Sequence, residues 1–224
     1  MKNKKILVLV AHADDEIIGC GGTLAKLSKN NKIMCVFYSD GETSRITSNT
    51  SDILKRKKNA LKVSNSLNIN KPMFLNFKDN QLDTYPLLEI IKETEKIINK
   101  FKPDIIFTHF DGDLNIDHQI VSRAVKTAIR PVLNKNIEKL YMMEILSSTN
   151  LMLNKNDAFY PNTYIDITQS IKVKEKCLKI YKDEMMIYPK IRSIHSIINL
   201  NAYRGSEISS KFCESFILVR EIIN

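Results

Sequence analysis

A buried-strand pattern runs directly into a cluster of charged side chains near the N-terminus, and this junction constrains the fold most. The apolar run at 6–11 is rich in Val, Ile and Leu, which is typical of a strand covered on both faces in a parallel sheet. His12, Asp14, Asp15 and Glu16 follow it directly. Because like charges repel, carboxylates crowded at the end of a buried strand predict a partner of opposite charge, such as a divalent cation.

Strand-like and helix-like patterns alternate along the rest of the chain. Strands are predicted at 6–10, 33–38, 73–77, 105–108, 140–146, 164–167 and 215–219. Helices are predicted at 15–27, 52–67, 87–101, 118–129 and 168–181, and long loops at 43–52 and 188–204. This alternation predicts a Rossmann-like α/β fold, in which helices flank a mostly parallel sheet, as a single domain over residues 1–224.

The composition indicates a globular chain. Of the 224 residues, 43% are hydrophobic and 26% are charged. Apolar runs all fall short of the roughly 18 residues needed to cross a bilayer. The lysines before the first apolar run imitate a signal peptide, but that run is short and ends in carboxylates. We therefore expect a cytoplasmic protein without a membrane span.

The net charge of +9 comes from 34 Lys and Arg against 25 Asp and Glu. It fits either anionic partners or a lysine-rich surface, and the even spread of the lysines favours the surface. The densest cluster, KRKK at 55–58, lies in a helical pattern without aromatic residues, so we expect no nucleic-acid partner. The four cysteines are scattered without a C-x-x-C pair, which predicts buried, reduced thiols.

A second loop with similar chemistry follows the strand predicted at 105–108. Its sequence is THFDGDLNIDH, at 108–118. The two loops together hold three of the four histidines, namely His12, His109 and His118. Ligands of open α/β sheets bind beyond the carboxyl ends of the strands, so both loops are expected at one site.

Two imidazoles and one carboxylate with an open fourth position make a catalytic zinc site. His12, Asp15 and His118 are the predicted ligands, because nitrogen donors favour Zn²⁺ over Mg²⁺ or Ca²⁺. Bound zinc lowers the pKa of its water to about 7, and Asp14 is placed to take the proton as general base. His109 fits either a packing partner or a site residue.

Two other interpretations of the first loop compete with a metal site. An acidic loop before a helix also fits an N-cap, with Asp14 or Asp15 capping and Glu16 facing the positive end of the helix dipole. The sequence GCGG at 19–22 is similar to part of a dinucleotide-binding fingerprint, but Leu24 stands where the third glycine belongs. The second loop favours the metal site, and the glycines are better explained by close packing of a helix on the sheet.

These motifs resemble those of the zinc-dependent PIG-L/LmbE family of N-acetylglucosamine deacetylases. AHADDE at 11–16 is similar to the family motif A-H-P-D-D-E, with Ala13 in place of proline. THFDGDLNIDH resembles the second family motif, T-H-x-x-x-D-x-H-x-D-H. Further similar segments are SDGE at 39–42, FYPNTYIDIT at 159–168 and YRG at 203–205. The resemblance therefore extends over nearly the whole chain.

By this resemblance, His12, Asp15 and His118 bind zinc, Asp14 is the general base and Arg56 lies near the substrate. The resemblance also implies that the fold is the Rossmann-like fold of the family.

The clear departure from the family pattern is Asn115, where many members have a histidine that stabilises the oxyanion or protonates the leaving amine. An amide cannot supply a proton but can donate a hydrogen bond to an oxyanion. Asn115 is therefore predicted to be a catalytic residue that replaces the histidine in one branch of the family. The acid role then falls to Asp14, once it has taken the water proton, or to His109. Asp117 matches the acid before the last ligand histidine and is predicted to orient an imidazole.

We therefore predict a zinc-dependent hydrolase that removes the N-acetyl group from a small N-acetylated sugar or sugar conjugate, with one Zn²⁺ per chain or another divalent metal in its place. Glu42 and Arg56 are the predicted substrate contacts, while Arg192 fits either a pocket-lining or a structural role. One alternative is a metal-dependent amidase acting on a thiol-precursor glycoside or an antibiotic intermediate. Another is a non-catalytic, nucleotide-binding α/β module. A homo-oligomer is compatible with any of these functions.

Overall fold

Seven strands form one sheet in a computed structural model of the chain, which describes residues 1–47, 49–132, 136–151 and 158–223. The strands are β1 (Lys5–Val10), β2 (Lys32–Ser39), β3 (Met73–Phe77), β4 (Ile105–His109), β5 (Lys139–Met143), β6 (Thr163–Asp166) and β7 (Cys213–Glu221). Their order is β3-β2-β1-β4-β5-β7-β6. The first five run parallel, whereas β7 pairs antiparallel with both β5 and β6.

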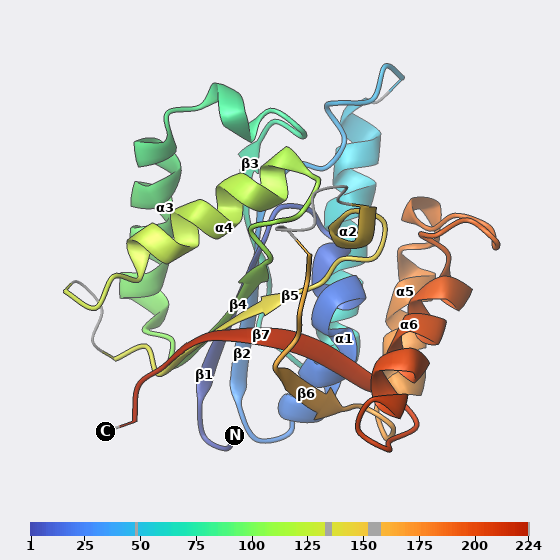
Figure 1. The fold of residues 1–224 in the computed structure, drawn as a ribbon. Helices are drawn as coiled ribbons and strands as arrows, with labels where there is room; N and C mark the ends of the chain where they lie inside the picture. The colour runs from blue at the N-terminus through green and yellow to red at the C-terminus, as the bar shows by residue number, and fades with distance from the viewer. Residues whose placement is uncertain (48, 133–135, 152–157, 224) are drawn as a thin grey trace.

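Helices cover both faces of the sheet (Figure 1). They are α1 (Asp15–Leu27), α2 (Thr50–Leu67), α3 (Leu87–Phe101), α4 (Ile116–Ala128), α5 (Ile171–Ile180) and α6 (Ile194–Ser206), with short 3₁₀ turns η1 (Leu82–Thr84), η2 (Thr149–Leu151) and η4 (Lys182–Glu184). Helices α3 and α4 lie on one face, and α1, α2, α5 and α6 lie on the other. The predicted single-domain α/β fold with a mostly parallel sheet is confirmed.

Strand β1 is covered on both faces of the sheet, which explains why its sequence is a continuous apolar run. Ile6 and Val8 pack into the core beneath α1 and α2, while Leu7 and Leu9 pack into the core beneath α3 and α4. Alternate side chains point to opposite faces of a strand, so a strand covered on both sides has no polar position. The strand order reverses between β1 and β4, and the loops that follow these two strands flank this switch point.

The glycines of α1 allow close packing of the helix, as predicted. A Cβ atom at Gly19 would lie 2.6 Å from the sulfur of Met143 in β5. A Cβ atom at Gly22 would lie 2.7 Å from Cδ1 of Ile167. Both distances are shorter than van der Waals contact, so glycine at these positions lets α1 pack closely against its neighbours.

The predicted loop at 188–204 is wrong over much of its length, because α6 begins at Ile194. The hydroxyl oxygen of Ser193 caps this helix by accepting a hydrogen bond from the amide of Ser196, at 3.1 Å. Isoleucine, asparagine and glycine are weak helix formers, so propensity alone does not indicate this helix. Burial of Ile197 in the core stabilises it.

The other boundaries shift by a few residues. Helix α2 starts at Thr50 inside the predicted loop at 43–52, and α4 starts at Ile116, two residues before the predicted start. Strand β5 ends at Met143, earlier than predicted, whereas β7 is longer than predicted.

All four cysteines are buried free thiols, as expected. Among the described residues, the helices are too short or too polar to span a membrane.

A buried ion pair holds α1 where its backbone leaves helical geometry at Cys20. The carboxylate of Glu214 accepts hydrogen bonds from the amides of Gly22, at 2.8 Å, and Thr23, at 2.7 Å. The ammonium group of Lys174 donates to Glu214 Oε1 at 2.6 Å and to the carbonyl oxygen of Ile18 at 2.9 Å. The pair therefore satisfies backbone groups that the bend leaves unpaired.

Substitution of Lys174 with methionine is expected to lower the free energy of unfolding by about 3–5 kcal/mol, because it leaves the buried carboxylate of Glu214 without its cation. Chemical denaturation measures this change. Lys179→Met is the matched control, since Lys179 pairs with Glu175 on the surface and should change the free energy by less than about 0.5 kcal/mol. Equal effects of the two substitutions would contradict the assigned role of Lys174.

Candidate metal centre

The loops after β1 and β4 bring the three predicted ligands together. His12 Nδ1 lies 3.1 Å from Asp15 Oδ2, and His118 Nε2 lies 3.3 Å from His12 Nδ1 and 3.4 Å from Asp15 Oδ2. One donor atom from each residue falls within 4.8 Å of the others, and all three residues are buried. We call His12, Asp15 and His118 the triad.

The donor set of the triad fits zinc. Two imidazole nitrogens and one carboxylate oxygen are the ligand types of a three-ligand catalytic site. Asp15 Oδ1 is buried without a hydrogen-bond partner among the described residues. A buried carboxylate oxygen without a donor is costly unless a cation compensates it, and a divalent ion at the triad would do so.

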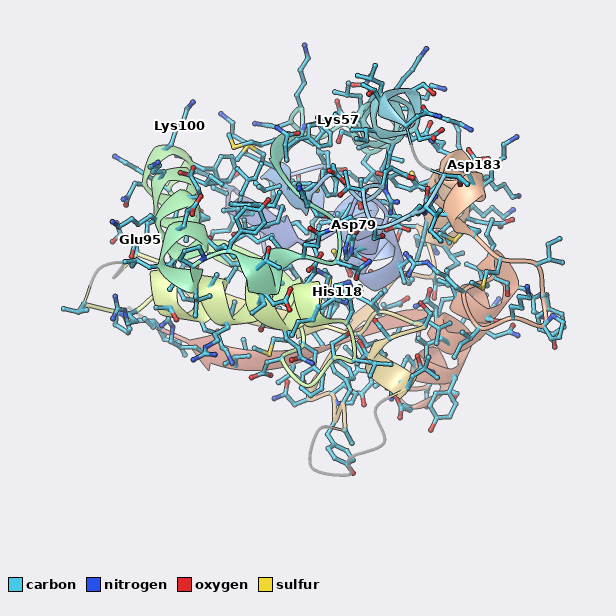
Figure 2. All side chains as sticks on the ribbon, turned by 90° about the horizontal axis from the view of Figure 1, so that it is seen from above. Lys57, Asp79, Glu95, Lys100, His118 and Asp183 are labelled. Atoms are coloured by element: carbon cyan, nitrogen blue, oxygen red, sulfur yellow. The ribbon has the colours of Figure 1, made fainter. Side chains whose placement is uncertain are left out.

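Carboxylates hold the outer nitrogen of each triad imidazole. His12 Nε2 lies 3.0 Å from Asp79 Oδ1 and 3.2 Å from Asp117 Oδ2, and His118 Nδ1 lies 3.1 Å from Asp113 Oδ1. Figure 2 labels both Asp79 and His118 near the middle of the molecule. Partners of this kind fix the orientation and tautomer of a metal-binding histidine.

Asp117 is itself fixed by backbone donors. It accepts hydrogen bonds from the amides of Asn80, at 2.8 Å, and Leu82, at 3.0 Å. The structure therefore places Asp117 against an imidazole, the position that the sequence predicted for it. Asp79 and Asp113 were not among the residues predicted from the sequence, although Asp113 lies inside the second loop and Asp79 follows strand β3.

Charges around the triad shift the pKa values of its members. Burial lowers the pKa of His12, but hydrogen bonds to Asp117, Asp15 and Asp79 outweigh burial and hold it well above its usual value. For His118, burial is likewise outweighed, mainly by the charge of Asp15, and its pKa rises to about 9. Burial raises the pKa of Asp15, but the charge of His118 lowers it well below its usual range. The charge state of each triad member therefore depends on the charges of the residues around it.

His109 lies buried against His118, and the acid role considered for it stays a prediction. Its Nε2 accepts a hydrogen bond from the amide of Ala11 at 2.8 Å, and its ring stacks on His118 with 3.8 Å between centroids. Burial and the charge of His118 lower its pKa well below the usual value, which favours the neutral ring. A fully buried imidazole whose Nε2 already accepts a backbone hydrogen bond cannot protonate a leaving amine from that atom. The structure gives His109 a packing position beside His118.

Two arginines hold the carboxylate of Asp14. Arg192 Nη2 donates to Asp14 Oδ2 at 2.6 Å, and Arg56 Nη2 lies 3.4 Å from Asp14 Oδ1. Arg192 also donates to Ser147 Oγ at 3.1 Å. The sequence is compatible with either a pocket-lining or a structural role for Arg192, and the structure places its guanidinium group against the predicted general base.

Arg56 also forms a wall of the adjoining pocket. Its Nη1 lies 3.1 Å from Glu42 Oε1 and 3.0 Å from Glu184 Oε2. A Cβ atom at Gly41, whose φ is +73°, would lie 2.6 Å from Arg56 Nε, so glycine is needed there on both counts. The pocket that opens beside the triad is lined by residues that include His12, Arg56, Asp79, Asn80, Asn115 and Arg192.

Glu42 is buried, pairs with Arg45 and Arg56, and lines a second pocket that also includes Arg56. Of the two predicted substrate contacts, Arg56 therefore lines the pocket beside the triad, whereas Glu42 lines the second pocket.

Asn115 is the N-cap of α4. Its Oδ1 accepts hydrogen bonds from the amides of Asp117, at 2.8 Å, and His118, at 3.3 Å. This fixes the orientation of the amide group, so Nδ2 points away from the helix, and it donates to Asn80 Oδ1 at 3.2 Å. Asparagine is among the best N-caps, and histidine is not among the favoured residues.

Substitutions at Asn115 separate capping from donation. Asn115→Ala is expected to lower the free energy of unfolding by about 1 kcal/mol, whereas Asn115→Asp keeps the capping oxygen and should stay within about 0.5 kcal/mol of the native chain. Thermal and chemical denaturation measure both changes. An Asn115→Asp chain as unstable as Asn115→Ala would contradict the capping role.

Comparison with known proteins identifies the family. The sequence model of the PIG-L family, described as GlcNAc-PI de-N-acetylase, matches residues 7–129. The uncharacterized deacetylase YaiS of Escherichia coli (strain K12) is 33% identical over an alignment of 137 residues, which covers 58% of this chain and 71% of that protein. The chain belongs to the PIG-L family, as the motifs predicted.

Solved structures share the fold at lower identity. The N,N'-diacetylchitobiose deacetylase from Pyrococcus horikoshii matches with a TM-score of 0.80 and 21% identity, covering 97% of this chain and 84% of that one. The 4-carboxy-2-hydroxymuconate hydratase GalB from Pseudomonas putida KT2440 matches with a TM-score of 0.78 and 15% identity, covering 99% and 98%. Because this fold occurs in proteins named for different reactions, the reaction of this chain must be argued from its site.

Proposed function

We propose that this chain is a zinc-dependent deacetylase that removes the N-acetyl group from an N-acetylated sugar or sugar conjugate. The observation that carries the proposal is the triad, in which two imidazole nitrogens and one carboxylate oxygen converge beside the buried carboxylate of Asp14. Family membership supports it, and the names of the relatives from Escherichia coli and Pyrococcus horikoshii are consistent with it.

Zinc bound by the triad would polarise an amide carbonyl and lower the pKa of a water to about 7. The chain supplies the proton transfers. Asp14 would accept the proton of the attacking water and return it to the leaving amine, so that one carboxylate serves as base and then as acid. Arg56 and Arg192 hold this carboxylate from two sides, which orients it for both transfers.

The pocket beside the triad suits a polar substrate. Asp79, Asn80 and Asn115 line it with carboxylate and amide groups that can bind sugar hydroxyls. One hydrogen on Asn115 Nδ2 bonds to Asn80, and we assign the other as a donor to the oxygen of the reacting carbonyl. Met185 and Met186 add the apolar part of the lining.

An acetate-release screen tests the proposed function. The zinc-loaded chain is incubated with N-acetylated monosaccharides, nucleotide-linked sugars, glycolipids and acetamido glycosides of thiol precursors, and free acetate and free amine are measured. Release of acetate and amine in equal amounts from at least one class is expected. A chain with one zinc per molecule that releases neither from any class would overturn the proposal and favour a binding module.

The remaining features of the proposal follow from the predictions above. We assign residues 1–224 to one deacetylase domain acting on a small-molecule substrate in the cytoplasm, with no nucleic-acid partner. The same screen separates the sugar deacetylase from the amidase alternative on thiol-precursor glycosides. For that amidase these glycosides would be the only class hydrolysed, whereas the sugar deacetylase is expected to hydrolyse at least one of the other three classes.

A further inference from the structure

The backbone of Asp14 is strained at the residue proposed as general base. Its φ is 143° and its ψ is −25°, a region that residues with a side chain rarely adopt. Such a conformation persists only where the surrounding structure determines it. The carbonyl oxygen of Asp14 accepts hydrogen bonds from the amides of Ile17 and Ile18, both at 3.0 Å, which holds one side of the residue in the first turn of α1.

The other side of Asp14 is held by a buried chain of two hydrogen bonds. The amide of Asp14 donates to Glu16 Oε2 at 2.9 Å. Glu16 Oε1 in turn accepts a hydrogen bond from the hydroxyl of Tyr181 at 2.8 Å. Glu16 is 1% exposed and Tyr181 is fully buried, so water does not compete for these contacts. Tyr181 follows the last residue of α5, so this chain links the packing of α5 to the backbone of Asp14.

We propose that Glu16 and Tyr181 are positioning residues, which hold Asp14 in its strained conformation and thereby aim its carboxylate at the attacking water. This inference rests on the proposed role of Asp14 as general base. If the amide of Asp14 lost its acceptor, the backbone would relax toward common φ values and turn the Cα–Cβ bond. Proton transfer requires hydrogen-bond distance and alignment, so even a small displacement of the carboxylate slows the reaction.

Substitution of Tyr181 with phenylalanine tests the inference, with Tyr38→Phe as the matched control. Both tyrosines are fully buried, and each hydroxyl makes one side-chain hydrogen bond, that of Tyr38 to Thr94 Oγ1 at 2.6 Å. Tyr38 packs toward α3 on the opposite face of the sheet. Tyr181→Phe is expected to lower kcat by about tenfold or more with KM and zinc content unchanged, whereas Tyr38→Phe should keep the native kcat.

Two substitutions at Glu16 extend the test. In Glu16→Gln, the amide oxygen can accept from the amide of Asp14 while its nitrogen donates to the hydroxyl of Tyr181, because a hydroxyl group can also accept. This variant should therefore keep kcat within about threefold of the native value. Glu16→Leu removes both contacts and should lower kcat further than Tyr181→Phe does.

A second measurement keeps the inference independent of the substrate. Hydrogen exchange at the amide of Asp14 should be faster in Tyr181→Phe than in Tyr38→Phe, since only the former weakens its acceptor. Equal kcat values and equal exchange in the two variants would overturn the inference. If the native chain releases no acetate, the proposed function fails instead, and the exchange rates alone then decide whether Tyr181 positions Asp14.

Discussion

Substitution of Asp14 with asparagine is expected to reduce acetate release by about a thousandfold while the zinc stays bound. An amide can accept a hydrogen bond from water but cannot take its proton, and loss of a general base typically costs 10²- to 10⁴-fold. Asparagine tolerates positive φ better than most residues, so the strained backbone should be kept. The measurements are kcat on the best substrate of the screen and zinc content by elemental analysis.

Asp111→Asn is the control for this variant. Asp111 lies in the second loop but is exposed and pairs with Lys126 on the surface. Its substitution removes one carboxylate of the second loop and leaves the triad unchanged, so kcat should change by less than about twofold. If Asp14→Asn keeps more than a tenth of the native kcat, Asp14 is not the base.

Substitution of His118 with alanine is expected to remove the metal and the activity together. One of the three proposed ligands is lost, and the remaining carboxylate and imidazole supply only two of the three donors that a catalytic zinc site needs. Zinc content after dialysis should fall from about one per chain to less than about a tenth. The midpoint of thermal unfolding should then no longer respond to added zinc, because a ligand stabilises only the state that binds it.

His195→Ala is the matched control for His118→Ala. His195 is the one histidine outside the two loops and is exposed at the start of α6. Its substitution should leave zinc content and the zinc-dependent rise in unfolding temperature unchanged. A His118→Ala chain that still binds one zinc with the native midpoint would show that the triad is not the metal centre.

The fold could be predicted because each central strand is an apolar run followed by an amphipathic helix. The part that could not be predicted is the antiparallel end of the sheet. Strand β7 pairs with β5 and β6 through backbone hydrogen bonds, and its sequence does not indicate a direction. Helix α6 was not predicted because it is stabilised by burial of Ile197 in the core, and the sequence pattern alone does not show this burial.

The convergence of the triad residues could be predicted because His12 lies just after β1, and Asp15 and His118 lie in the first turns of the helices that follow β1 and β4. The positions of Asp79 and Arg192 could not, because their contacts depend on loops that only the fold brings near: Asp79 reaches His12 from the loop after β3, and Arg192 reaches Asp14 across 178 residues. The position of His109 also depends on a backbone amide, that of Ala11, which directly follows the neighbouring strand β1.

The pairing of β1 with β4 has a consequence for folding. Two of the three triad members precede the third by more than 100 residues, and they meet only after these two strands have paired. An ion held there would tie the two halves of the parallel sheet as a removable cross-link that closes one long loop. Partly folded chains would lack this cross-link. Tight retention of zinc would therefore distinguish the molecules in which β1 and β4 have paired from those in which they have not.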